Sequence, residues 1–260
     1  MPELPEVAYQ KKYVDATALH KKIVKVETGA AKLFQSPQKD FKKALENLKF
    51  EETTQLGKYL FLKINSWQQL VFHFGMTGKV EYYQHEEVPK HAQLTTVFDD
   101  GSRLSFVCPR KFGKIYLAEG VEEFQKKHSL GNHALDVRQK EFLELLQDKK
   151  GSIKGALTNQ HVIAGIGNLY ADEMLYQCGI HPKSKTENLS GEDKKCLFKE
   201  MGRVLKRVIK SKTEDSKLPD SFLTRHRKEG AECPNCKGSV KMIKVSGRST
   251  YLCPNCQEEK

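Results

Sequence analysis

Four cysteines near the C-terminus constrain the fold of this chain more than any other feature of its sequence. They form two Cys-x2-Cys pairs, Cys233/Cys236 and Cys253/Cys256, with 16 residues between the pairs. Two residues between thiolates allow one tight turn to present both sulfurs to a tetrahedral ion, and two such turns complete a four-thiolate zinc site. Four protein ligands leave no position for water, so we expect one structural Zn2+. The alternative is that these cysteines are fortuitous or form disulfides.

The residues between the two pairs predict a β-hairpin. Residues 240–245 and 249–252 read as strands, joined at Ser246-Gly247-Arg248. A hairpin of this size cannot bury a core, so the metal would supply its stability. Arg248 at the tip can reach a phosphate, and a solvated turn residue is the alternative.

The remainder of the chain divides into a β-rich part and a helical part. A first helix is expected from Pro5 to about Leu19, because Pro5 suits a first helical position and Glu6 favours the positive end of the helix. Alternating segments predict an antiparallel sandwich or barrel. These segments are residues 23–26, 59–64, 70–74, 79–83, 93–98 and 103–107. Helical periodicity begins after about Leu130 and covers residues 142–146, 164–177 and 194–209. The polar residues 211–221 read as a linker or mobile loop.

Charge narrows the class of partner. The chain has 44 Lys and Arg against 33 Asp and Glu, a net charge of +11. This excess favours a polyanion through the release of counterions, with a merely basic soluble protein as the alternative. We see no apolar run of about 18 residues and no signal region, so we expect a cytoplasmic, nucleoid-associated protein without a membrane partner. Three scattered cysteines are expected to be reduced thiols there, namely Cys108, Cys178 and Cys196.

Two further segments carry chemistry. Gly165 and Gly167 precede a helical run that starts near Asn168, where backbone N–H groups and the helix dipole favour a phosphate; Lys154 adds a charge upstream. A simple helix connection is the alternative.

At the N-terminus, removal of Met1 would leave Pro2 as a secondary amine. Such an amine is partly unprotonated near neutral pH and forms an iminium on attacking a sugar C1′. A lead-in to the first helix is the alternative.

Three separate motifs resemble the formamidopyrimidine-DNA glycosylase family, the Fpg/Nei superfamily. They are the opening Pro2-Glu3-Leu4-Pro5-Glu6-Val7, the string Gly165-Ile166-Gly167-Asn168 and the four-cysteine hairpin. The resemblance implies a bifunctional DNA glycosylase and AP lyase of base excision repair. The enzyme would act on damaged double-stranded DNA through a Schiff base, followed by β- and δ-elimination. It would be a monomer without a small-molecule cofactor.

The resemblance also implies roles for single residues. Pro2 would be the nucleophile, Glu3 the acid that protonates the opening deoxyribose ring, and Lys58 a phosphate ligand beside the lesion. Glu6 and Glu173 would support this chemistry, Glu173 by orienting the N-terminal proline. The residues expected to bind DNA are His73, Met76, His91, Arg110, Phe112, Lys154, Asn168 and Arg248. Met76 would fill the gap left by the extruded base, with Arg110 and Phe112 as partners, because chemistry at C1′ requires a flipped nucleotide.

Met76 and Phe112 also fit ordinary core positions, which is the alternative for both. The sequence departs from the family pattern at Ala8, Cys108, Lys111 and Lys237. The stretch from Lys212 to Arg227 is shorter than in typical members, where a loop closes over 8-oxoguanine. We therefore expect removal of formamidopyrimidines, with 8-oxoguanine, oxidised pyrimidines or another lesion as alternatives. A catalytically silent lesion-binding protein and an RNA-bound zinc ribbon are the alternatives from other classes.

These inferences define an α+β fold in three parts. Residues 1–128 would form an N-terminal catalytic β-sandwich domain with flanking helices. Residues 129–222 would form a helix–two-turn–helix DNA-binding domain, and residues 223–260 the zinc-finger hairpin. The resemblance places DNA in a basic cleft between the domains.

Overall fold

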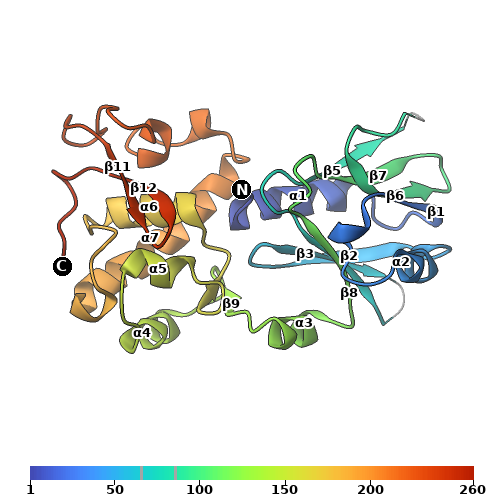
Figure 1. Cartoon of the computed structure of the whole chain (residues 1–260), viewed down its shortest axis with the longest axis horizontal. Coiled ribbons are helices and arrows are strands. Elements are labelled where there is room, and N and C mark those ends of the chain that lie inside the picture. Colours follow the sequence, from blue (N-terminus) through green and yellow to red (C-terminus); the bar gives the residue numbers. More distant parts are fainter. Residues whose placement is uncertain (65–66, 85–86) are drawn as a thin grey trace. The chain divides into compact units, whose positions relative to one another are not determined.

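The computed structural model describes residues 1–64, 67–84 and 87–260, and the chain divides into two compact units, residues 1–129 and 130–260 (Figure 1). The change of pattern expected after about Leu130 lies at this boundary. The zinc hairpin and the helical segments both belong to the second unit, so the predicted division into three domains stays a prediction.

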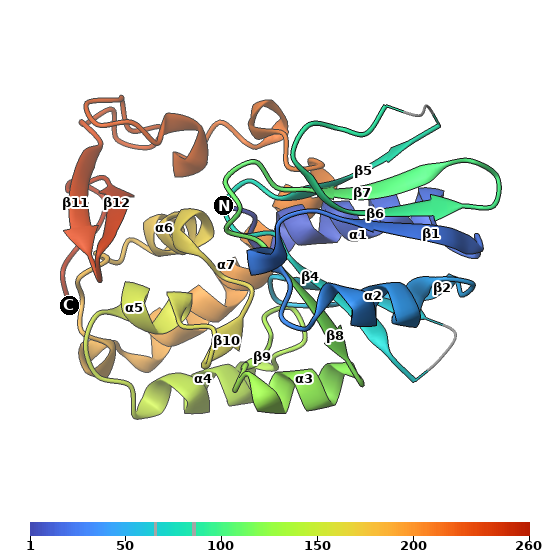
Figure 2. The ribbon, with the colours of Figure 1, turned by 45° about the vertical axis from the view of Figure 1, so that its right-hand side comes forward.

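Two four-stranded antiparallel sheets form the first unit (Figure 2). One sheet has the order β1-β6-β7-β5 and the other β2-β3-β4-β8. The strands are β1 Ile23–Thr28, β2 Phe50–Leu56, β3 Tyr59–Ile64, β4 Gln69–His73, β5 Lys79–Tyr83, β6 Ala92–Phe98, β7 Arg103–Val107 and β8 Lys114–Ala118. The expected antiparallel sandwich is thereby confirmed. The sequence did not predict β2 and β8, because β2 is mostly polar and β8 follows directly on a Gly-containing loop.

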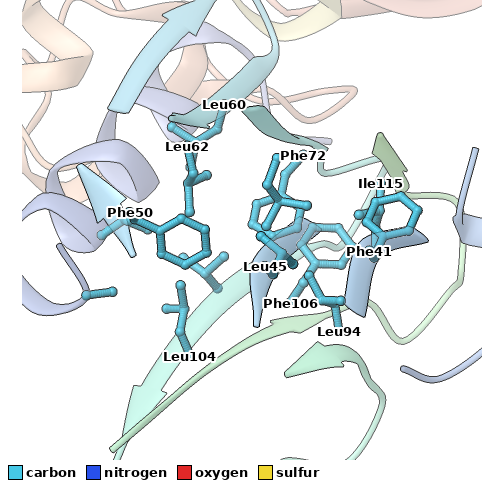
Figure 3. Close-up of a cluster of buried hydrophobic side chains, with 14 of the residues drawn as sticks. Phe41, Leu45, Phe50, Leu60, Leu62, Phe72, Leu94, Leu104, Phe106 and Ile115 are labelled. Carbon is cyan, nitrogen blue, oxygen red and sulfur yellow. The ribbon is translucent and has the colours of Figure 1, made fainter. Parts of the chain in front are cut away.

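Apolar side chains of both sheets form the core of this unit (Figure 3). Phe72 of β4 stacks on Phe106 of β7 with the ring centroids 4.7 Å apart, so the two sheets contact each other through these rings. Each large apolar side chain buried in this way contributes about 1.5–3 kcal/mol. The helical elements of the unit are α1 Leu4–Thr17, η1 Ala31–Leu33, α2 Gln38–Leu45 and α3 Val121–Lys127.

The second unit is mainly helical. Its helices are α4 Gln139–Gln147, α5 Ile153–Thr158, α6 Asn168–Gln177 and α7 Gly191–Lys210, with 3-10 turns η2 Thr186–Asn188, η3 Asp215–Lys217 and η4 Leu223–His226. Short strands β9 Asn132–His133 and β10 Ile163–Ala164 pair in parallel, and β11 Lys241–Val245 pairs with β12 Arg248–Leu252. Together the two units confirm the predicted α+β class. Within the described ranges, no helix is long and apolar enough to cross a membrane.

One expectation for the second unit was wrong. Cys178 and Cys196 were expected to be reduced thiols, but the structure joins them by a disulfide with Cα atoms 5.9 Å apart. Cys178 ends α6 and Cys196 lies on α7, and these helices pack together, which a separation of 18 residues does not reveal. The polar segment 211–221 contains η3 and a buried Leu218, and its predicted role as a linker or mobile loop stays a prediction.

Candidate active site and nucleic-acid interface

The N-terminus of α1 holds the predicted nucleophile and acid. Glu3 is the N-cap residue, and its backbone amide donates to the Glu6 carboxylate at 2.7 Å in a reciprocal capping box. Pro5 lies in the first turn, where it has no amide hydrogen to satisfy. Pro2 directly precedes the cap, and Glu3 is 2% exposed. The sequence Pro-Glu-Leu-Pro-Glu therefore fixes the start of the helix and the position of both catalytic candidates.

A side-chain amide connects the turn of Lys58 to this helix start. Gln55 donates to the carbonyl of Leu4 at 2.9 Å and to that of Gly57 at 2.8 Å. Gly57 has a φ of +55°, the left-handed conformation that glycine adopts without strain. Lys58 follows it and is 6% exposed. Lys58 is thus placed on a turn held against the first residues of α1, and the sequence did not identify Gln55 as the link.

His73 lies beside this turn on β4. It is paired in register with Tyr59, and their ring centroids are 5.0 Å apart. Burial, with smaller contributions from the charges of Lys58 and Lys114, lowers the pKa of His73 to about 4. The imidazole is therefore neutral at pH 7 and can offer hydrogen bonds but no positive charge.

Two loops of the first unit bring Met76, Arg110 and Phe112 together. A Cβ on Gly75, whose φ is +61°, would lie 2.5 Å from the carbonyl carbon of Phe112, so the loops are in direct contact. The Arg110 guanidinium lies 5.4 Å from the centre of the Phe112 ring. Met76 is 41% exposed and Phe112 56% exposed. This exposure excludes the alternative in which both are core residues.

Cys108 and His91 support the loop that carries Arg110. The amide of Cys108 donates to the carbonyl of His91 at 3.1 Å, and the Cys108 sulfur accepts from the amide of Gly113 at 3.4 Å. Cys108 is fully buried. The buried thiol therefore helps to hold the loop that carries Arg110. His91 contributes its backbone to this arrangement, and its predicted contact with DNA stays a prediction.

In the second unit, Gln160 organises the glycine-rich turn ahead of α6. Its side chain accepts from the amide of Gly165 at 3.0 Å and donates to the carbonyl of Ile166 at 2.7 Å. Gly165 has a φ of +118°, which explains why α6 starts at Asn168 rather than at residue 164. The turn leads directly into the first residue of a ten-residue helix, and its predicted binding of a phosphate stays a prediction.

The hairpin tip lies next to this turn. Ser246 and Gly247 both have positive φ, as a two-residue type I′ turn requires. The Asn168 side-chain amide donates to the carbonyl of Ser249 at 2.9 Å, and Arg248 donates to the Thr158 hydroxyl at 3.3 Å. Asn168 and Arg248, predicted from distant motifs, are therefore brought to the same part of the second unit.

Lys154 and Glu173 are buried, which the sequence did not predict. Lys154 is 1% exposed and bonded to Asp172 at 2.6 Å, so it is not presented to a phosphate in this structure. Glu173 accepts from the amide and hydroxyl of Thr224, each at 2.7 Å. Burial raises the pKa of Glu173. Its predicted action on Pro2 stays a prediction.

The four cysteines form a structural zinc site. Their sulfur atoms all lie within 4.8 Å of one another, with 3.8 Å between Cys233 and Cys256 and 3.4 Å between Cys236 and Cys253. A tetrahedral ion with Zn–S bonds of about 2.3 Å requires a sulfur cluster of this size. The Tyr176 hydroxyl of α6 lies 3.2 Å from the Cys233 sulfur, a neighbour that sequence reasoning missed.

The fold and site define a class of protein: a β-sandwich unit that begins with a proline-led helix, and a helical unit that carries a four-cysteine zinc finger. Family models match each part. They are the formamidopyrimidine-DNA glycosylase N-terminal domain at residues 1–115, the H2TH domain of that enzyme at residues 130–219, and the zinc finger found in FPG and IleRS at residues 230–258.

Whole-chain similarity agrees with these matches. The formamidopyrimidine-DNA glycosylase of Streptococcus mutans is 34% identical over 276 residues, which covers 100% of both chains. The Lactococcus lactis enzyme bound to DNA with an AP site is 29% identical, with a TM-score of 0.91 over 99% of this chain and 100% of that one. Its complex with DNA containing FAPY-dG has a TM-score of 0.90, with 28% identity and the same coverage. The chain belongs to the formamidopyrimidine-DNA glycosylase family.

Proposed function

We propose that this protein is a DNA glycosylase and AP lyase of base excision repair that removes oxidised bases from double-stranded DNA. Family membership supports the activity, and solved relatives contain DNA with an AP site or a FAPY-dG lesion. The observation that carries the proposal is the start of α1, where Pro2 and the buried Glu3 lie beside the turn of Lys58.

The reaction begins at the amine of Pro2, once Met1 has been removed. The nitrogen attacks C1′ of the flipped nucleotide, the bond from C1′ to the base breaks, and the base leaves with a proton. Glu3 protonates the ring oxygen as the deoxyribose opens, and the C1′–N bond becomes an iminium. This electron sink permits β-elimination of the 3′ phosphate and then δ-elimination of the 5′ phosphate. Water then hydrolyses the C1′–N bond, which regenerates the Pro2 amine, so the products are a one-nucleotide gap with phosphate ends and the released sugar fragment.

Three polar side chains are proposed to hold the phosphates beside the lesion: Lys58, Asn168 and Arg248. The exposed Met76 and Phe112, with Arg110, offset part of the unstacking cost of a few kcal/mol when the nucleotide leaves the stack. The zinc ion supplies folding stability to the hairpin that carries Arg248. The protein is proposed to act as a monomer.

Ring-opened formamidopyrimidines are the proposed lesions. The short segment from Lys212 to Arg227 favours them over 8-oxoguanine, because little chain remains to enclose the flipped base. Oxidised pyrimidines are the second candidate, for the same reason.

Borohydride trapping tests the proposal. The mature protein is incubated with duplexes that contain formamidopyrimidine, 8-oxoguanine, dihydrouracil or an abasic site, and covalent adducts are counted after reduction. We expect an adduct that an N-terminal extension abolishes and that the matched variant Pro5→Ala retains. Pro2→Gly, which replaces the secondary amine by a primary one, should slow formation of the adduct. Tight binding to lesion DNA without an adduct on any duplex would instead support the catalytically silent alternative.

A further inference from the structure

Asp172 is a buried carboxylate to which the proposed reaction assigns no role. It lies on α6 four residues after Asn168, so the two side chains share one face of the helix. Asp172 is 0% exposed. Asn168 binds the carbonyl of Ser249, and Asp172 accepts from the amide of Tyr251 at 3.1 Å. These two bonds attach consecutive turns of α6 to β12, directly beside Arg248.

Two cations meet at this carboxylate from other segments. Lys154 of α5 contacts one carboxylate oxygen at 2.6 Å, and Arg227 contacts the other at 2.9 Å. Lys154 also donates to the hydroxyl of Thr250 at 2.5 Å, and the Arg227 guanidinium lies 4.5 Å from the centre of the Tyr251 ring. Asp172 therefore joins α5, α6, β12 and the end of the short segment 212–227.

We infer that Asp172 is a positioning residue that fixes the hairpin tip against α6, so that Asn168 and Arg248 meet one phosphate at a set separation. The inference rests on the proposed function. Lys154 then acts as an internal partner of Asp172 rather than as a DNA ligand. A buried charged network adds little net stability compared with apolar packing, whereas its directional bonds restrict the arrangement of the segments it joins.

A double-mutant cycle distinguishes positioning from a general effect on the fold. The affinity for a duplex with a tetrahydrofuran abasic analogue is measured for wild type, Asp172→Asn, Arg248→Ala and the double variant. We expect Asp172→Asn to weaken binding about tenfold in the wild-type background and less than about twofold in the Arg248→Ala background. An equal loss in both backgrounds would overturn the inference, because a general effect on the fold does not depend on Arg248.

Two further variants keep the test decisive if Asp172→Asn fails to fold. Thr250→Val removes the bond from Lys154 and the bond that the Thr250 hydroxyl donates to the carbonyl of Arg248 at 3.2 Å, without changing a charge. Both bonds hold the hairpin tip, and we expect their loss to weaken binding about threefold with zinc content and Tm retained. Glu200→Gln is the matched control, since Glu200 is a buried carboxylate of α7 that is ion-paired with Arg203 at 2.5 Å away from the hairpin. Its affinity should equal that of wild type. Unchanged binding by Thr250→Val would contradict the inference.

Kinetics on abasic DNA separate this inference from the proposed function. With Asp172→Asn we expect KM to rise about tenfold while kcat for adduct formation changes little, because the reacting atoms are untouched. A wild-type protein that forms no adduct would contradict the proposed function itself. Normal wild-type chemistry, together with a wild-type KM for Asp172→Asn, would contradict only the role of Asp172.

Discussion

Met76 and Phe112 show what single-residue geometry adds to a motif. Both are apolar residues that fit core positions in the sequence, yet the structure leaves a large part of each side chain in solvent. Lys154 is the opposite case, because its charge predicts a phosphate ligand and the structure buries it on Asp172. The exposed fraction of a side chain depends on which other segments pack around it, and a local sequence pattern does not contain this information.

His73 carries the prediction that belongs to the residue scale. Its pKa is lowered from 6.5 to about 4, so below pH 6.5 the unfolded chain binds more protons than the folded one. The stabilising contribution is complete above pH 6.5 and is lost as the pH falls towards 4, by at most about 3 kcal/mol. We expect the free energy of unfolding in urea to fall less steeply between pH 6.5 and 4.5 in His73→Gln than in wild type. Identical slopes would show that His73 does not contribute.

At the scale of elements, helices and strands with strong local sequence signals were predicted, and those with weak signals were missed. The proline and glutamate of the opening motif predict the start of α1, which lies one residue earlier than expected, at Leu4. Six strands were predicted from alternation. The helices α2, α3 and α5 were not predicted, because each is at most eight residues long and depends on packing against its neighbours.

The disulfide between α6 and α7 gives a prediction at this scale. Closing a loop of about 18 residues stabilises a fold by about 3 kcal/mol, mainly by restricting the unfolded chain. We expect a reductant to lower the Tm of the wild-type protein. Cys178→Ser should have a Tm below that of the oxidised wild type, and reductant should not change it. Cys108→Ser is the control, because the buried Cys108 thiol is not part of the disulfide. Reductant should lower the Tm of this variant as it lowers that of the wild type. A wild-type Tm that does not change with reductant would show that the disulfide does not stabilise the fold.

At the scale of the whole molecule, each of the two units contains an apolar cluster. The first has the core between its sheets, and a second apolar cluster contains Cys233, Cys253 and Tyr176 beside the zinc site. Zinc therefore stabilises the second unit directly. Among the residues that the structure describes, the first unit contains no group of three or more possible metal ligands.

Metal removal tests this division. Chelation of zinc should release one equivalent of metal and abolish tight DNA binding, since the hairpin that carries Arg248 loses its stability. The β-sheet signal in circular dichroism should persist, because the sandwich of the first unit has its own core. Cys253→Ser should reproduce the loss. Complete unfolding on chelation would contradict the independence of the first unit.

The sequence by itself determined the zinc ligands, the start of α1, the glycine turn before α6 and the family. Each of these depends on residue types at short spacing, where chain geometry leaves few alternatives. Only the tertiary structure decided that Gln55 links the turn of Lys58 to α1, that Cys178 forms a disulfide with Cys196, and that Asp172 forms an ion pair with Lys154. These contacts join residues 18 to 51 positions apart along the chain. Their partners are chosen by how helices and strands pack, which depends on the whole core rather than on any local pattern.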